Sequence, residues 1–263
     1  MYAFAYERPA SMADALAKIS AGGQALAGGQ TLIASLKQRL AQPSGLIDLA
    51  GVAELSGIKK DGNNIVIGAM TRHETVADSA EVKAAIPALA ALAGGIGDRQ
   101  VRAMGTMGGS VANNDPAACY PSAVLALGAT VQTNKRTITA DDFFQGMYTT
   151  ALEEGELITA IHFPAPQKAA YAKFRQPASR FALVGVFVAQ TANGVRVAIT
   201  GAGNGVFRHA GLEAALTKSF TPEAVEGVAI DAAELNGDLH ASAAFRAQLI
   251  KVQTQKAVRQ ANG

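Results

Sequence analysis

The sequence predicts an α+β fold in two parts, a larger one over residues 1–164 and a smaller one over residues 165–263. Short apolar runs that suit strands alternate with stretches of helical spacing along the whole chain. The character changes at Pro164-Ala165-Pro166, where neither proline can donate to a β-ladder, and this sets the boundary. The 263 residues, 49% of them hydrophobic, suffice for one large domain or two modest ones.

The first elements are a helix, a strand and a second helix. Residues 10–20 place apolar side chains on or near one helical face, and Ala25 to Ala27 form a short apolar run that suits a strand. After Gly28-Gly29-Gln30-Thr31, the residues Leu32, Ile33, Leu36 and Leu40 fall at helical spacing. Lys37 and Arg39 then lie near the helix C-terminus, where cations are favoured.

A second unit divides the larger part into subdomains of about residues 1–55 and 56–164. Residues 61–64, Asp-Gly-Asn-Asn, predict a turn between two strands, and residues 71–74, Thr-Arg-His-Glu, fit a capping box. We expect one helix through EVKAAIPALAALA that stops at Gly94-Gly95, and a strand hairpin about Asn134-Lys135. Asp141-Asp142 indicates a helix N-cap pair.

The smaller part is expected to combine strands with helices. Residues 183–189 and 195–200 predict strands, and helices follow them. The last helix is amphipathic through Phe245, Leu249, Ile250 and Val252. Gly201-Ala-Gly-Asn-Gly205 resembles the start of a dinucleotide motif, but the G-x-G-x-x-G pattern needs glycine where this chain has Val206, so we interpret it as a turn.

Composition excludes several classes of protein. A net charge of +2, with no long basic run, gives no indication of nucleic-acid binding. No stretch approaches the ~18 apolar residues of a membrane span, and the N-terminus lacks a secretory leader, so we expect a cytoplasmic protein. The single cysteine, Cys119, excludes an internal disulfide and a cysteine-ligated iron–sulfur cluster within this chain. The four histidines have no metal-ligand spacing, and His73 is expected to stabilise a helix start.

Two glycine loops are the candidate binding site. AGGQT at residues 27–31 and TMGGSVANN at residues 106–114 each pair two glycines with a following polar residue. Glycine lets the main chain approach a phosphate closely, and the N–H groups of a turn or helix N-terminus can donate to its oxygens. Either loop alone is equally consistent with an ordinary turn or helix cap, and only their combination is informative.

The chain resembles the FAD-binding medium subunit of the molybdenum hydroxylases, the family of carbon monoxide dehydrogenase and xanthine dehydrogenase. The stretches that carry the resemblance are LAGGQTLIASLKQRL, IVIGAMTRHETVADS, IGDRQVRAMGTMGGSVANNDPAACYPSAVLALGA, FRQPASRFALVGVFVA and DLHASAAFRAQL. They span nearly the whole chain. The resemblance implies a two-part FAD-binding domain of the vanillyl-alcohol-oxidase-like type, followed by a smaller C-terminal α+β domain.

The resemblance also implies a set of residues around a non-covalent FAD. The first loop would cradle the pyrophosphate, the second would form the opposite wall, two isoleucines would contact the flavin, and a basic residue would reach it, Arg175 before Lys173. These residues are Leu26, Ala27, Gly28, Gly29, Gln30, Thr31, Leu32, Ile33, Ile96, Thr106, Gly108, Gly109, Ser110, Cys119, Ile158, Lys173 and Arg175. The resemblance implies no catalytic residue and no metal ligand in this chain.

Cys119 departs from the family pattern, which has an aspartate at this point of the DPAAD-type segment. A neutral thiol accepts weaker hydrogen bonds than a carboxylate does. Cys119 therefore either packs as a small buried hydrophobe or loosens FAD modestly.

The resemblance implies an electron-transfer role within a three-subunit oxidoreductase. A large molybdopterin-binding subunit would oxidise the substrate, a small subunit would carry two [2Fe–2S] clusters, and this chain would pass electrons from the nearer cluster to an external acceptor. Two alternatives stay open. One is a freestanding FAD-dependent oxidase, and the other is a flavin-free scaffold subunit of such a complex.

Overall fold

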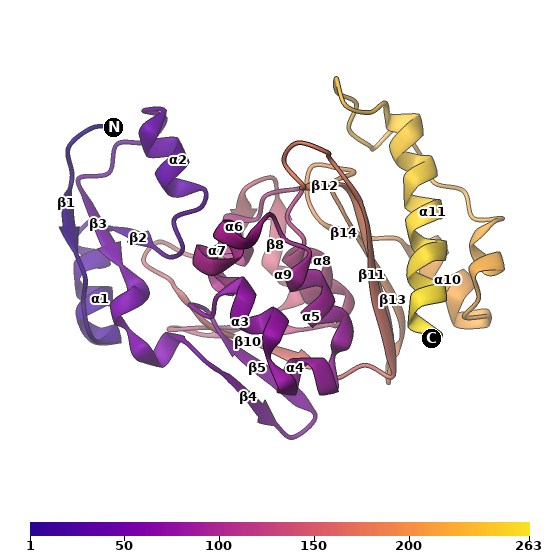
Figure 1. The fold of residues 1–263 in the computed structure, drawn as a ribbon, viewed down its shortest axis with the longest axis horizontal. Helices are drawn as coiled ribbons and strands as arrows, with labels where there is room; N and C mark the ends of the chain where they lie inside the picture. Colours follow the sequence, from indigo (N-terminus) through magenta and orange to yellow (C-terminus); the bar gives the residue numbers. More distant parts are fainter.

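The computed structural model describes all 263 residues. The chain runs along the long axis of the molecule, from the N-terminal sheet at one end to helix α11 at the other (Figure 1). Both strands and helices occur along its whole length, so the predicted α+β class is confirmed. None of the helices combines the length and the apolar character that crossing a membrane requires.

A small parallel sheet begins the fold. Strands β1 (Ala5–Glu7), β3 (Gly45–Asp48) and β2 (Gln24–Leu26) lie side by side in that order, and helix α1 (Met12–Ser20) starts at Ser11, whose hydroxyl accepts the N–H of Asp14. Helix α2 (Leu32–Lys37) follows the first glycine loop. The expected extension of this helix to Leu40 was wrong. Arg39 has a φ of 61°, in the left-handed region that ends helices, and Leu40 is 76% exposed.

The middle of the molecule is a five-stranded antiparallel sheet covered by short helices. Its order is β4 (Ile58–Asp61), β5 (Asn64–Gly68), β10 (Ile158–Pro164), β6 (Thr130–Thr133) and β7 (Thr137–Thr139). Both predicted hairpins, at Asp61–Asn64 and about Asn134-Lys135, are confirmed. Strands β8 (Phe144–Gly146) and β9 (Thr149–Thr150) form a separate pair.

The helices over this sheet are shorter than the sequence predicts. They are α3 (His73–Asp78), α4 (Ala80–Ala85), α5 (Pro87–Gly94), α6 (Arg99–Met104), α7 (Met107–Asn113), α8 (Tyr120–Ala126) and α9 (Ala140–Phe143). The single helix expected through EVKAAIPALAALA is two helices, because Ile86 leaves the helical region before Pro87, which starts α5.

Three local expectations about helix starts and loops were wrong. Arg72, without a side-chain bond, is the N-cap of α3, whereas the Thr71 hydroxyl bonds the N–H and C=O of Gly57. Asp141 lies in the first turn of α9 behind Thr139, and it pairs with arginines of the C-terminal part. The TMGGSVANN segment is largely helix α7 rather than an irregular loop.

The C-terminal part is a four-stranded antiparallel sheet between helices. Strands β11 (Lys168–Arg175), β12 (Ala182–Thr191), β13 (Gly194–Thr200) and β14 (Phe207–Arg208) lie in chain order. Helices α5 and α8 cover one face, and α10 (Ala210–Lys218) and α11 (Ala243–Ala261) cover the other (Figure 1). Short 3₁₀ turns at Leu49–Gly51, Ala53–Leu55 and Pro222–Val225 complete the fold.

The buried face of α11 differs from the predicted one. Leu249 and Ile250 are buried as expected, but Phe245 and Val252 are 44% and 41% exposed. The main core also includes Phe187 and Ala198 of the C-terminal sheet, which pack with the helices of the middle part. Apolar packing therefore continues across residue 165, and the division of the chain there stays a prediction.

Candidate functional site

A cleft of about 670 Å³ lies where the N-terminal sheet, the middle helices and the C-terminal sheet meet. The first glycine loop lines it, and so do residues of α7 and of the segment before α8. Ile158 at the start of β10 and the connection between β11 and β12 close the ends. The volume falls within the ~300–1,000 Å³ typical of cofactor and ligand pockets.

The first glycine loop presents unused hydrogen-bond donors to the cleft. The backbone N–H groups of Gly28, Gly29, Gln30 and Thr31 donate to no group of the protein. Gly29 has a φ of +70°, so the chain turns here in a conformation that side chains rarely adopt. Four successive free N–H groups form a concave site for an anion such as a diphosphate.

In the second glycine segment, the backbone N–H groups that the sequence suggested as donors to a ligand donate to groups of the protein instead. In the first turn of α7, the N–H of Met107 donates to Thr71, that of Gly108 to Ala69, and that of Gly109 to the Thr106 hydroxyl. The N–H groups at the start of α7 therefore have partners within the protein and are not free to bind a phosphate. What this helix start gives the cleft is the surface of Gly108 and Gly109, which lack side chains, and the hydroxyl of Ser110, which bonds no protein group.

The two glycine segments touch one another. A Cβ on Gly109 would lie 3.1 Å from the Cβ of Ala27, and a Cβ on Gly28 would overlap the carbonyl oxygen of Met104. A Cβ on Gly108 would lie 2.9 Å from the backbone of Ala69. Gly28 and Gly108 are thus needed for packing, and so is Gly29, because its Cβ would lie 2.9 Å from Cγ1 of Ile33. Gly109 borders both the Thr106 hydroxyl and Ala27.

Lys173 reaches the far end of the cleft from strand β11. Its ammonium group donates to the carbonyl oxygens of Gly95 at 2.9 Å and Arg180 at 3.1 Å, and to Sγ of Cys119 at 3.3 Å. Cys119 is only 5% exposed, so it packs as a buried side chain at the cleft wall. This lysine ties three segments together that are distant in sequence.

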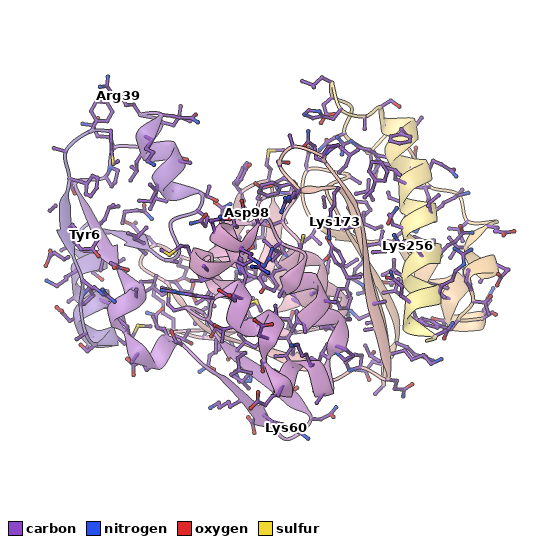
Figure 2. All side chains as sticks on the ribbon, in the orientation of Figure 1. Tyr6, Arg39, Lys60, Asp98, Lys173 and Lys256 are labelled. Carbon is purple, nitrogen blue, oxygen red and sulfur yellow. The ribbon has the colours of Figure 1, made fainter.

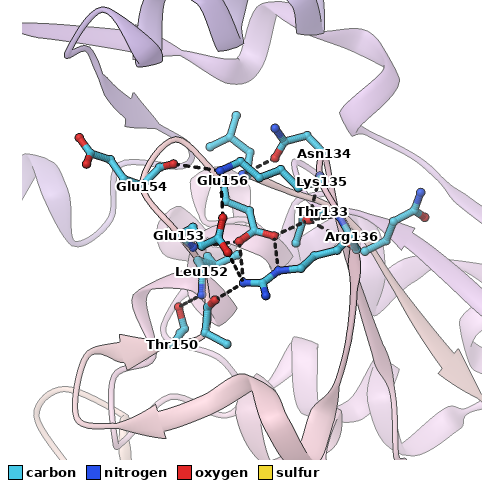
Figure 3. Close-up of polar contacts among 12 residues, drawn as sticks. Thr133, Asn134, Lys135, Arg136, Thr150, Leu152, Glu153, Glu154 and Glu156 are labelled. Carbon is cyan, nitrogen blue, oxygen red and sulfur yellow. Dashed lines mark hydrogen bonds and ion pairs between the residues drawn. The ribbon is translucent and has the colours of Figure 1, made fainter.

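Glu156 lies beside Ile158 in the cleft wall, and a polar network holds it there (Figure 3). Burial alone would raise the pKa of its carboxyl. The Arg136 guanidinium, the backbone N–H of Glu153 and the hydroxyl of Thr133 together lower that pKa to about 2. The carboxylate therefore stays charged and fully engaged, and it serves as an anchor for the hairpin rather than as a proton acceptor.

His73 lines the cleft from the start of α3. Its ring is 5% exposed and lies 5.2 Å from the ring of Tyr120, and its Nδ1 has no hydrogen-bond partner. Burial and the nearby charge of Arg102 lower its pKa to about 4. Its backbone N–H donates to Gly105, which fits the expected structural role at the helix start, although through the main chain.

The structure brings most of the expected residues into the cleft. Those that line it are Ala27, Gly28, Gly29, Gln30, Thr31, Leu32, Ile96, Thr106, Gly108, Gly109, Ser110, Cys119, Ile158 and Lys173. Leu26 and Ile33 lie beneath Gly29 instead. Arg175 lines a separate small cavity, so Lys173 is the basic residue of β11 that reaches the cleft.

Sequence reasoning missed part of the wall. Asp115, Glu156 and the Ser179–Phe181 stretch also line the cleft. Nothing in the sequence of the Ser179–Phe181 stretch predicted which cavity it would border. Arg180, with a φ of 62°, is held there by Gly97 and Lys173.

These features fit a flavin dinucleotide. The cleft has the required size, a cluster of free N–H groups for the diphosphate, a glycine surface beside them, and apolar and cationic side chains for a ring system. The geometry thus defines a dinucleotide-binding cleft of an α+β protein.

Comparisons with known proteins agree. Residues 2–166 match the family described as "FAD binding domain in molybdopterin dehydrogenase". The chain is 36% identical to the carbon monoxide dehydrogenase medium chain of Hydrogenophaga pseudoflava over 94% of both chains, and 33% identical to the glyceraldehyde dehydrogenase medium chain of Sulfolobus acidocaldarius over 98% of both. The structure of reconstituted CO dehydrogenase from Oligotropha carboxidovorans matches with a TM-score of 0.90 at 32% identity, covering 99% of this chain and 98% of that one.

The chain belongs to the molybdenum hydroxylase family of oxidoreductases, as one of its FAD-binding medium subunits. The expected family and enzyme class are thereby confirmed.

Proposed function

We propose that this chain binds one non-covalent FAD in the cleft and carries electrons from a [2Fe–2S] cluster of a small partner subunit to an external acceptor. In this proposal the substrate is oxidised on a large molybdopterin-binding subunit. The observation that carries the proposal is the row of unpaired N–H groups at Gly28 to Thr31, beside the Gly108-Gly109 surface in a cleft of suitable size.

FAD would supply the redox chemistry, since its ring exchanges one or two electrons. The residues of this chain would bind and orient it. The first glycine loop donates to the diphosphate, the side-chain-free start of α7 permits close approach, and Lys173 places positive charge at the other end of the cleft. Positive charge near the ring favours negative charge on it, which assists reduction.

Two ionisable groups of the cleft, Glu156 and His73, argue for electron transfer rather than substrate oxidation. A third, the carboxylate of Asp115, accepts the N–H of Ala117 and the hydroxyl of Tyr148. Glu156 is locked in its network with a pKa of about 2, and His73 is neutral with a pKa of about 4. A general base for substrate activation works best with a pKa near the operating pH. These two groups are therefore poorly suited to abstract a proton from a substrate.

The test is the flavin content and reactivity of the purified chain. We expect one FAD per chain that is released by acid precipitation, reduced by dithionite and reoxidised by an artificial dye. The chain alone should not oxidise aldehydes, purines or N-heterocycles, and adding the molybdenum and iron–sulfur subunits should give substrate-driven flavin reduction. Turnover by the lone chain would establish the freestanding oxidase, and a folded chain that takes up no FAD would establish the scaffold.

A further inference from the structure

A second cavity of about 170 Å³ lies behind the cleft, between the C-terminal end of α5, strand β11 and helix α11. Lys173 and Arg175 of β11 line it, as do Lys256 and Gln260 of α11. Arg175, Lys256 and Gln260 are exposed, so this cavity is open to solvent. Figure 2 labels Lys173 on the strand and Lys256 on the neighbouring helix. Lys173 also lines the cleft, so it stands between the two cavities.

The lining of this cavity is cationic and lacks a compensating carboxylate. Ala91, Gly95, Tyr171 and Ala172 complete it, and none of the eight lining residues is acidic. No ion pair of the structure includes Lys173, Arg175 or Lys256. Like charges that line one small cavity repel one another, and a bound anion would relieve that repulsion.

The C-terminal end of α5 explains the position of only some of these cationic side chains. The Lys173 ammonium donates to the carbonyl oxygen of Gly95, and the Arg175 guanidinium lies 3.6 Å from where a Cβ of Gly95 would stand. Cations are favoured at a helix C-terminus, which explains these two residues. Lys256 comes from another helix, where it and Gln260, four residues apart, face the same cavity and make no hydrogen bond to the protein with their side chains.

We propose that this cavity binds a small oxyanion, with phosphate as its model ligand. Arg175 and Lys256 would provide charge-assisted donors, Gln260 a neutral one, and Lys173 further positive charge. About 10–15 Å³ of volume of this kind holds one water molecule, so the cavity has room for a tetrahedral oxyanion and several waters. The phosphate group of a nucleotide could also enter it.

The test is a titration of the full-length, FAD-saturated chain with inorganic phosphate at low ionic strength, followed by calorimetry. Potassium chloride at matched ionic strength controls for screening. Adenosine monophosphate in a parallel titration distinguishes a free oxyanion from the phosphate group of a larger ligand. We expect one saturable phosphate site, weakened about tenfold by Lys256→Gln and again by Arg175→Gln, because a hydrogen bond to a charged group contributes roughly 1.5 kcal/mol or more. If adenosine monophosphate binds more tightly than phosphate, and the same two variants weaken that binding, the site is supported and its ligand is the phosphate group of a larger molecule.

Arg259→Gln is the matched control. Arg259 is an exposed cation on the same helix that lines neither cavity and pairs with no acid, so its loss should leave phosphate binding unchanged. The proposal is overturned if phosphate binds no better than chloride at about 20 mM, or if binding survives the Lys256→Gln/Arg175→Gln double variant.

Failure of this inference is distinguishable from failure of the proposed function. Phosphate binding to the FAD-free chain that saturating FAD abolishes, and that stays intact in the double variant, would assign the phosphate to the FAD cleft and contradict the second site. Flavin content is measured in each variant. A chain that retains FAD but binds no phosphate contradicts only the oxyanion site, and one that binds phosphate at Lys256 without FAD contradicts only the flavin proposal.

Discussion

The ammonium nitrogen of Lys173 lies 3.3 Å from Sγ of Cys119, although the two residues are 54 positions apart in the chain. Cys119 stands where the resemblance implies an aspartate. The structure therefore provides a cationic partner for a carboxylate at a position that holds a thiol. The Lys173 ammonium is also held in position by the backbone carbonyls of Gly95 and Arg180. These two hydrogen bonds do not depend on the residue at position 119.

Substitution of Cys119 should reveal what the thiol contributes. Cys119→Ser should leave FAD affinity nearly unchanged, because Lys173 keeps its two carbonyl partners. Cys119→Asp should form an ion pair with Lys173 and either tighten FAD or leave its affinity unchanged. Fluorescence titration of the apoprotein with FAD measures both. Weaker FAD binding in Cys119→Asp would show that the thiol itself is needed beside the flavin.

Alkylation of Cys119 should be slow in the folded chain. The side chain is 5% exposed and packs in the main core, so a reagent needs local opening to reach it. The rate of thiol modification, with and without denaturant, measures this. Rapid modification of the folded protein with loss of flavin would contradict an inert packing role.

Gly29→Val should abolish FAD retention. The substitution places a branched side chain in the loop whose N–H groups are unpaired, at a φ of +70°. Gly62→Val is the control for backbone strain, because Gly62 has a φ of +57° with nothing within 4 Å of its added Cβ, in the β4–β5 hairpin. Flavin absorbance per folded chain is compared between the two variants. If both lose the same amount of FAD, backbone strain alone explains the effect of Gly29→Val.

Gly109→Val should also prevent FAD binding, because it displaces the two glycine segments that line the cleft. Its Cβ would lie 2.8 Å from the Thr106 hydroxyl and 3.1 Å from the Cβ of Ala27 on the first glycine loop, before the two extra methyl groups are added. Far-ultraviolet circular dichroism confirms folding, and the flavin spectrum reports retention. Stoichiometric FAD in folded Gly29→Val and Gly109→Val together would refute the role of both segments.

His73 should make the protein less stable as pH falls from about 6.5 to about 4. Its folded pKa of about 4 lies below its ordinary value, so the unfolded chain binds the proton first and the free energy of unfolding decreases through that window. The full effect is about 3 kcal/mol. His73→Phe should flatten this part of the pH profile in urea unfolding, whereas His240→Phe, at an exposed position, should not. An unchanged slope in His73→Phe would contradict the neutral, buried state.

Glu156 should act in a lower pH window. Its folded pKa of about 2 lies below the ordinary 4.5, so its stabilisation is complete above about 4.5 and is lost as pH falls toward 2. Glu156→Gln should lower the free energy of unfolding at pH 7 by about 1–3 kcal/mol. Glu153→Gln, whose exposed carboxylate contacts the same Arg136, should change it by under about 1 kcal/mol. Similar losses in both variants would contradict the anchoring role of Glu156.

Local patterns in the sequence were sufficient for the strand–glycine–helix unit at residues 24–37 and for both predicted hairpins. In these segments the contacts lie within a few residues of each other, so the order of glycine, polar and apolar residues decides the geometry. The helix divisions were predicted less well. A new helix starts at Pro87, and Arg39 lies just after the end of α2 with a positive φ. Both boundaries depend on the backbone angles of single residues, which the spacing of apolar residues does not reveal.

The sequence by itself determined the family, the α+β class and the two glycine segments that border the cleft. Only the tertiary structure decided their different roles, because the N–H groups of α7 are used by Thr71 and Ala69, more than 30 residues earlier, while those of the first loop find no partner. It also decided which basic residue reaches the cleft. Lys173 and Arg175 are two residues apart on β11 and both line the second cavity, but only Lys173 also lines the cleft, a difference that strand alternation does not predict.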